Sequence, residues 1–193
     1  MRRKGTITKE RIINASIKVF QEKGISKSSM SIIADEVGLQ KSSIYYFFPS
    51  KNDLVFETLV EAKDKFLEFL DKKLNPEKPK QSLQDYFEAI IKFHKERQLK
   101  GGCIFGNSAL EMSDKNDQVR QLLCETFLKW KEKIKKVVIS GIKKGGFRSD
   151  LDPEEISWQI VLTVEGGIMI ARTCRNIHYL ENALKNLEEW IYL

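Results

Sequence analysis

The chain of 193 residues is 41% apolar, enough to bury the core of one domain or of two small ones, and its formal net charge is +6. No run approaches the roughly 18 consecutive apolar residues that cross a membrane, and no apolar segment follows the basic N-terminal residues, so we expect neither a membrane span nor a secretion signal. The three cysteines are too few and too widely spaced for a disulfide framework, which favours a reduced cytoplasmic compartment.

The first expected element is a helix from Thr8 to about Lys23, preceded by a disordered segment at residues 1–7. Its apolar residues recur at helical spacing, and Gly24 follows as a C-terminal stop. This helix is expected to complete a three-helix module with the two short helices that come next.

Two short helices around a glycine are expected between residues 28 and 48. Ser28 or Ser29 begins the first helix and Gly38 ends it, and the second begins near Gln40. Their inward-facing residues are Met30, Ile33, Ala34, Val37, Ile44, Phe47 and Phe48. The outer side of the second helix is polar and nearly free of carboxylates. This arrangement is typical of a helix-turn-helix, which presents a recognition helix to the major groove of DNA.

The charge distribution supports a nucleic-acid partner for this part of the chain. Residues 1–50 contain nine lysines and arginines against four acids, whereas the other 143 contain 24 against 23. A basic segment on a neutral body indicates that a polyanion binds at one end. A basic solubilising tail is the alternative that composition alone leaves open.

The remaining sequence has helical periodicity throughout, interrupted by glycine and proline. The expected helices cover about 51–74, 82–98, 103–112, 116–144, 154–174 and 176–192. No strand pattern or repeat is present. The sequence therefore predicts an all-α protein of about nine helices, with an N-terminal helix-turn-helix domain (1–50) joined to a larger helical domain (51–193).

Residues from Thr8 to about Leu59 resemble the DNA-binding domain of TetR/AcrR-type transcriptional regulators. The residues that carry the resemblance are Phe20, Gly24, Ile33, Ala34, Gly38, the stretch QKSSIYYFF at 40–48, and Ser50 with Lys51. Gln40 stands where serine is common, which bears on the bases that are read. Phe47 stands where histidine is frequent, which removes one possible phosphate donor. The resemblance implies a repressor that binds double-stranded DNA, with residues 51–193 as an effector-binding and dimerisation domain.

The resemblance also implies which side chains contact DNA. Ser29 and Ser31 are expected to bind phosphate at the start of the first short helix, helped by its N-terminal dipole. Base edges are expected to be read by Gln40, Lys41, Ser42 and Ser43. Tyr45 is expected to give its hydroxyl to a phosphate, with Tyr46 beside it at the DNA, and Lys51 is expected to pair with another phosphate. Core packing is the alternative for the two tyrosines, and a buried ring can still offer its hydroxyl.

A homodimer on a palindromic operator is expected, because one such module is too small to find a unique site in a genome. The last two helices resemble the family's dimerising pair, in which four helices from two chains form a bundle. Two stripes are expected to make the interface, namely Ile160, Val164, Gly167 and Ala171 on one helix and Leu180, Leu184, Leu187 and Ile191 on the other. A monomer core that uses the same stripes is the alternative.

A small-molecule effector is implied by a second resemblance, to a subgroup of these regulators with GCxxGNxxxE in the ligand domain. Here that motif spans Gly102 to Glu111, and an EG…AR pattern follows at Glu165–Arg172. Helices between 82 and 174 are expected to enclose a pocket for an apolar or aromatic molecule. Its candidate walls are Phe87, Phe93, Cys103, Phe105, Met112, Phe127, Trp130 and Trp158, for each of which plain core packing is the alternative.

Cys103 has a second interpretation, because some relatives with this glycine-cysteine pair sense electrophiles or oxidants through the thiol. It lies near an expected helix N-terminus, which favours the thiolate. The alternative is a small buried apolar residue. Cys124 and Cys174 are expected to be packing residues.

The sequence argues against an enzyme. The two histidines, His94 and His178, belong to no HExxH motif, metal-spaced cluster or phosphate loop. A His94–Cys103 pair is the best nucleophile candidate, and nothing orients it. We therefore expect no catalytic residue, no metal and no cofactor. A non-regulatory architectural DNA-binding protein is the remaining alternative, and it leaves the large neutral domain without a purpose.

Overall fold

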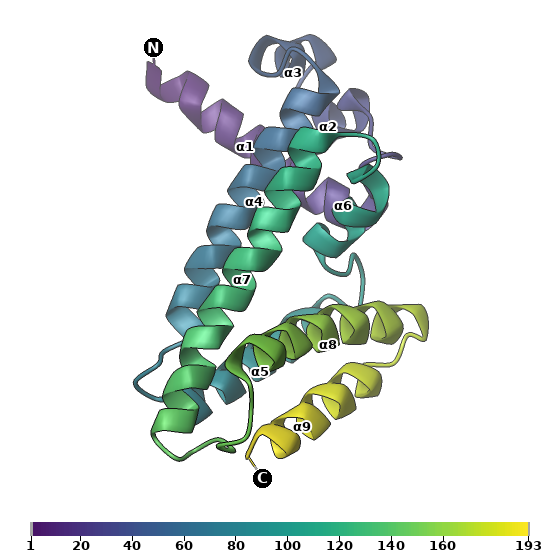
Figure 1. Cartoon of the computed structure of the whole chain (residues 1–193). Coiled ribbons are helices and arrows are strands. Elements are labelled where there is room, and N and C mark those ends of the chain that lie inside the picture. Colours follow the sequence, from purple (N-terminus) through teal and green to yellow (C-terminus); the bar gives the residue numbers. More distant parts are fainter. Residues whose placement is uncertain (1, 193) are drawn as a thin grey trace. The chain divides into compact units, whose positions relative to one another are not determined.

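A computed structural model gives the fold for residues 2–192, with side chains described from Thr8 to Tyr192. Nine helices and no strand form within residues 2–192 (Figure 1), which confirms the predicted all-α class. The helices are α1 (Arg2–Lys23), α2 (Met30–Val37), α3 (Lys41–Phe47), α4 (Lys51–Lys73), α5 (Pro79–Glu96), α6 (Ile104–Met112), α7 (Asp117–Lys143), α8 (Pro153–Thr173) and α9 (His178–Tyr192).

The chain forms two compact units. The first contains the residues up to Lys65 together with Ile104–Cys124, and the second contains Phe66–Cys103 and the residues from Glu125 onward. Helices α4 and α7 each contribute residues to both units. This division differs from a boundary at 50/51, because α6 and the start of α7 belong with the helix-turn-helix.

Helix α1 begins at Arg2 instead of Thr8, so the predicted disorder of residues 2–7 was wrong; Met1 lies outside the described residues. Arginine and lysine are good helix formers, and only Gly5 opposes a helix in this segment. Residues 2–7 therefore extend the first helix by almost two turns.

The helix-turn-helix forms as the sequence predicts. Ser29 caps α2, since its hydroxyl oxygen accepts a hydrogen bond from the N–H of Ile32 at 3.2 Å. Gly38 ends α2 with φ +70°, in the left-handed region that glycine adopts without strain. Ile33, Ile44 and Phe48 are fully buried, while Phe47 is only partly buried. The core of this unit thus faces away from the polar side of α3.

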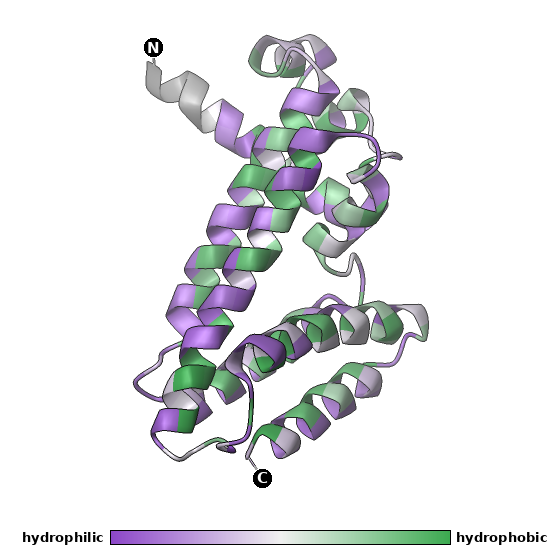
Figure 2. Cartoon of the chain, viewed as in Figure 1, coloured by the Kyte–Doolittle hydropathy of each residue, from purple (hydrophilic) through white to green (hydrophobic). Residues whose placement is uncertain are grey.

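The second unit is built around apolar residues of α5, α7, α8 and α9 together with the end of α4. Trp130 and Tyr86 lie at its centre, where the indole N–H of Trp130 donates to the Tyr86 hydroxyl at 2.9 Å. Helices α8 and α9 pack along each other, and apolar residues recur along both (Figure 2). A continuous core of this kind supplies most of the driving force for folding.

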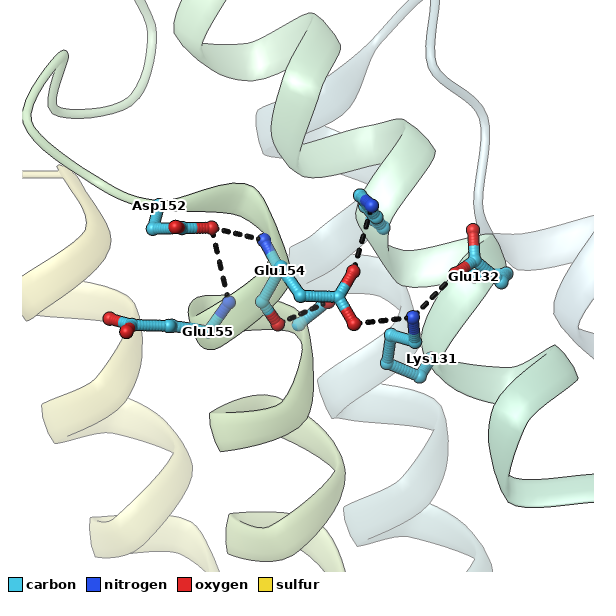
Figure 3. A network of polar contacts seen from close by, with 7 residues as sticks. Lys131, Glu132, Asp152, Glu154 and Glu155 are labelled. Carbon is cyan, nitrogen blue, oxygen red and sulfur yellow. Dashed lines mark hydrogen bonds and ion pairs between the residues drawn. The ribbon is translucent and has the colours of Figure 1, made fainter. Parts of the chain in front are cut away.

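The start of α8 is fixed by a polar network (Figure 3). Asp152 caps the helix by accepting from the N–H of Glu154 at 2.7 Å, and Pro153 occupies the first helical position. The Glu154 carboxylate pairs with Lys131 and Lys135 of α7, both at 2.7 Å, and Lys131 also bonds to Glu132. Hydrogen bonds from the two lysines lower the pKa of Glu154 to about 2. The charges therefore join α7 to the first turn of α8.

Candidate functional site

The outer side of α3 is open to solvent and polar. Gln40, Lys41 and Ser42 are exposed, and Ser43 is partly so. Tyr45 is 44% exposed and Tyr46 82%, so core packing does not account for Tyr46. These side chains are free to meet a surface outside the unit.

A cation–π contact organises part of this surface. The ammonium of Lys41 lies 5.7 Å from the centre of the Tyr45 ring. Helix α3 itself, Lys41–Phe47, contains no acidic residue. Its outer side therefore offers donors and a positive charge without a carboxylate that would repel phosphate.

The N-terminus of α2 adds hydroxyl groups. Ser29 and Ser31 are exposed, and Ser29 uses its oxygen as a cap acceptor. A hydroxyl that accepts still has its own proton to donate. Both serines can thus hydrogen-bond an anion at the positive end of the helix.

Lys51 does not point outward, in contrast to its expected role. Its ammonium donates to the backbone carbonyl of Ile25 at 2.6 Å, and the side chain is half-buried. Burial lowers the pKa of Lys51, while the nearby Glu111 carboxylate acts in the opposite direction. In this structure Lys51 holds the loop between α1 and α2.

Glu111 of α6 holds the same loop from the other side of the Ile25 peptide. Its carboxylate accepts from the N–H of Ile25 at 3.0 Å and from the N–H of Ser26 at 2.6 Å. Burial raises the pKa of Glu111, but the hydrogen bonds from Ser26 and Ile25 outweigh it, and the net pKa lies below the ordinary value. In the sequence, Glu111 stands out only as the last residue of the GCxxGNxxxE motif.

Gly24 makes room for this carboxylate. A Cβ at position 24 would lie 2.5 Å from Oε1 of Glu111, and the backbone has φ +80°. Both conditions require glycine. We name the set Gly24, Ile25, Ser26, Lys51 and Glu111 the loop clamp.

The two stripes predicted for the dimer interface lie inside the chain. Seven of their eight residues are at most 7% exposed and belong to the core of the second unit, namely Ile160, Val164, Ala171, Leu180, Leu184, Leu187 and Ile191. The eighth, Gly167, lies against Leu180, because a Cβ there would come within 2.8 Å of its Cδ1. Helices α8 and α9 use these residues to pack on each other within one chain, so their side chains offer little surface to a partner.

The outward sides of α8 and α9 carry a different apolar set. Its exposed members are Leu162, Met169, Ile170, Tyr179 and Trp190, of which Leu162 is 62% exposed. An open groove of about 510 Å³ lies between the two helices, with Thr163, Ala183, Asn186 and Trp190 among its lining residues. We name these residues together the α8–α9 face. Exposed apolar side chains gathered in this way mark an interaction surface.

The candidate effector residues do not form one group. Phe87 and Trp130 lie in the core of the second unit, and Cys103, Phe127 and Trp158 are packed against it. Phe105 and Met112 are buried in the first unit. Phe93 is exposed, and the guanidinium of Arg97 lies 5.4 Å from its ring centre.

The cysteines differ in their surroundings. Cys103 is partly buried, and its thiol hydrogen-bonds to Glu165 of α8. Cys124 and Cys174 are exposed, so their predicted packing roles were wrong. Among residues 2–192, no group of three or more His, Cys, Asp or Glu side chains is placed to hold a metal.

Comparison with known protein families identifies the chain. Residues 12–58 match the family described as bacterial regulatory proteins, tetR family, and residues 79–187 match the tetracyclin repressor-like C-terminal domain. The chain belongs to the TetR family. Its family and its relatives are transcriptional regulators, not enzymes.

Individual relatives extend over nearly the whole TetR-family chain. It is 29% identical over 182 residues to the HTH-type transcriptional repressor DhaR of Mycobacterium sp. (strain GP1), covering 93% of this chain and 89% of that protein. It is 26% identical over 176 residues to the HTH-type transcriptional regulator LmrA of Bacillus subtilis (strain 168), covering 88% of each. The crystal structure of a TetR transcriptional regulator from Chloroflexus aurantiacus superposes with a TM-score of 0.87 at 28% identity, covering 97% of this chain and 96% of that chain. Within the described residues, no helix of this TetR-family chain has the length and hydropathy of a membrane span.

Proposed function

We propose that this TetR-family regulator is a cytoplasmic homodimeric repressor that binds a palindromic operator and is released by a small apolar or aromatic effector. The observation that carries this proposal is the open polar side of α3, with Ile44 and Phe48 buried behind it. In functional terms residues 1–50 bind DNA, and residues 51–193 bind the effector and the second copy.

The proposed DNA contacts are of two kinds, contacts to base edges and contacts to backbone phosphates. Gln40, Lys41, Ser42 and Ser43 read base edges, with glutamine suited to adenine and lysine to guanine. Phosphates are bound by Ser29, Ser31, Tyr45 and Tyr46. Lys51 reaches phosphate only if it gives up its bond to Ile25, so we assign it a smaller share.

The dimer forms through the α8–α9 face. The core stripes are already occupied, and Leu162, Met169 and Trp190 point outward beside them. Burial of apolar area at about 25 cal/mol per Å² favours pairing of such a surface with its own copy. Two recognition helices then bind half-sites about one helical turn apart, roughly 34 Å on DNA.

Effector binding shifts the population between DNA-competent and incompetent states. Swinging of the helix over residues 51–73 changes the separation of the two recognition helices. The GCxxGNxxxE motif, which resembles that of a subgroup of the family, also includes Cys103 and Glu111. Its Gly102 and Cys103 belong to the second unit, and its Glu111 belongs to the loop clamp of the first.

An electrophile or redox sensor is the second candidate, because Cys103 directly precedes the N-terminus of α6. Its bond to Glu165 opposes the idea, since a carboxylate disfavours a neighbouring thiolate. If Cys103→Ser leaves release from DNA by N-ethylmaleimide or hypochlorite unchanged, the sensor is excluded.

Selection of bound DNA from a random pool tests the proposed function. The expected product is an inverted repeat with half-sites about one turn apart. Recovery of no preferred sequence refutes the repressor and favours an architectural DNA-binding protein. The genomic neighbours of a recovered site then indicate the regulated genes.

A further inference from the structure

Glu165 of α8 is a half-buried acid, and one of its carboxyl oxygens has no hydrogen-bond partner. Its Oε1 is shielded from solvent and has no hydrogen-bond partner, although Cys103 bonds to the carboxyl group. Burial raises the pKa of Glu165, and the bond from Cys103 offsets this in part. An unpaired polar atom shielded from water in this way destabilises the protein. A ligand that supplies a donor removes this destabilisation.

Aromatic rings surround the acid's neighbour, Tyr86. This tyrosine is fully buried, and its hydroxyl accepts from Trp130, which leaves the hydroxyl proton to donate. The charges of Glu165 and Cys103 both act on it and, after burial, contribute to raising the pKa of Tyr86 far above its ordinary value. The acid, the thiol and the phenol therefore belong to one neighbourhood.

This neighbourhood continues into a cluster of rings. Tyr86 contacts Phe69 and Phe87 with ring centres 6.4 and 5.6 Å apart. Trp130 contacts Phe66 edge-to-face at 4.9 Å and stacks on Phe127 at 6.2 Å. Ring faces carry negative potential and attract cations, as does a carboxylate. The site is thus suited to an apolar body that carries a positive charge.

We propose that Glu165 is the polar anchor of the effector site, and that the effector is a protonated amine on an apolar or aromatic body. The ammonium donates to Oε1 of Glu165, and the body packs on the rings next to Tyr86. The bound pair is an ammonium and a carboxylate; any proton on the carboxyl group moves to an amine that enters as the free base, or to solvent when the amine enters as the cation. This inference rests on the proposed function and specifies its ligand.

Binding of matched probes tests the proposal. Phenethylamine and octylamine are compared with 2-phenylethanol and 1-octanol, by calorimetry on the wild-type dimer and by release of labelled operator DNA. At least one amine is expected to bind at least tenfold more tightly than its alcohol. Failure of both amines to bind, or equal affinity for amine and alcohol, overturns the proposal without any variant.

Two variants assign the preference to a residue. Glu165→Gln keeps the shape, removes the charge, and is expected to weaken amine binding by about 10- to 100-fold, the range for a lost buried charge partner of roughly 1.4–2.8 kcal/mol. The alcohols should change less than about twofold. Glu155→Gln, an exposed acid of the same helix, is the control and should match wild type. Amine affinity that survives in Glu165→Gln overturns the proposal.

Operator binding without any probe distinguishes a failure of the proposed function from a failure of the Glu165 assignment. Glu165→Gln is expected to bind operator as wild type does. If neither protein binds a specific duplex, the proposed function fails. If both bind DNA but the amine preference is absent, only the assignment of Glu165 fails.

Discussion

The loop clamp makes a measurable prediction for Glu111→Ala. The substitution removes two charge-assisted hydrogen bonds to the backbone of the α1–α2 loop, at 3.0 and 2.6 Å. Such bonds are worth about 1.5–3 kcal/mol each, but Ser26 is exposed and water replaces part of its bond. We therefore expect local opening to become easier by about 2 kcal/mol, which is roughly a thirtyfold change in the opening equilibrium.

Amide hydrogen exchange of Ile25 and Ser26 measures this opening directly. Exchange at both amides should accelerate about thirtyfold in Glu111→Ala, while Asp114→Ala, an exposed acid just beyond α6, should leave it unchanged. Unchanged exchange in Glu111→Ala would refute the clamp.

The acid dependence gives a second readout of the same clamp. The pKa of Glu111 is lowered by folding, so its stabilisation is present above its ordinary pKa of 4.5 and is lost as the pH falls through the folded value. Wild-type exchange should lose its extra protection over that range, and Glu111→Ala should have none to lose.

The remaining predictions concern DNA, assembly and pH. Lys41→Glu should weaken binding to the selected site and change the preference at the base pair that it reads, and Tyr45→Phe should weaken binding about fivefold. Fluorescence anisotropy measures both affinities, and unchanged affinity in both variants would contradict the interface. Leu162→Arg should convert the dimer to a monomer in sedimentation at micromolar concentration, and a persistent dimer would exclude the α8–α9 face. Burial, aided by the charge of Arg97, lowers the pKa of His94 to about 4 from 6.5. The unfolded chain therefore binds a proton that the folded chain does not, and stability should fall by about 3 kcal/mol between pH 6.5 and 4. His94→Gln should flatten that part of the urea-measured profile, and an unchanged slope would assign it to other groups.

Local signals explain why the helix-turn-helix could be predicted. The cap at Ser29, the left-handed Gly38 and the spacing of Ile44 and Phe48 each act within a few residues of sequence. The outward position of Gln40 follows from the same spacing. No long-range information was needed for this part of the site.

Long-range contacts explain what the sequence did not reveal. Glu111 bonds to a residue 86 positions earlier, and Lys51 to one 26 positions earlier, so no local pattern reports either bond. Without that knowledge Lys51 is naturally assigned to phosphate. For the same reason the sequence does not show that α6 belongs to the same compact unit as the helix-turn-helix.

Helix α8 shows that apolar periodicity alone does not predict which side of a helix is buried. Its surface is apolar on two sides, with Ile160 and Val164 on one and Leu162 and Met169 on the other. The spacing of apolar residues along α8 is compatible with either stripe as the buried one. It does not show which stripe packs within the chain. Only the position of α9 distinguishes them, because it covers the first stripe.

Gly24 and Glu111 have a consequence for how this protein can diverge. Any larger residue at position 24 meets the carboxylate at 2.5 Å and must also accept φ +80°. Position 24 can therefore not change alone, and a residue larger than glycine there is expected together with a smaller or shorter side chain at position 111. We therefore expect positions 24 and 111 to covary in an alignment of the family, although they are far apart in the sequence.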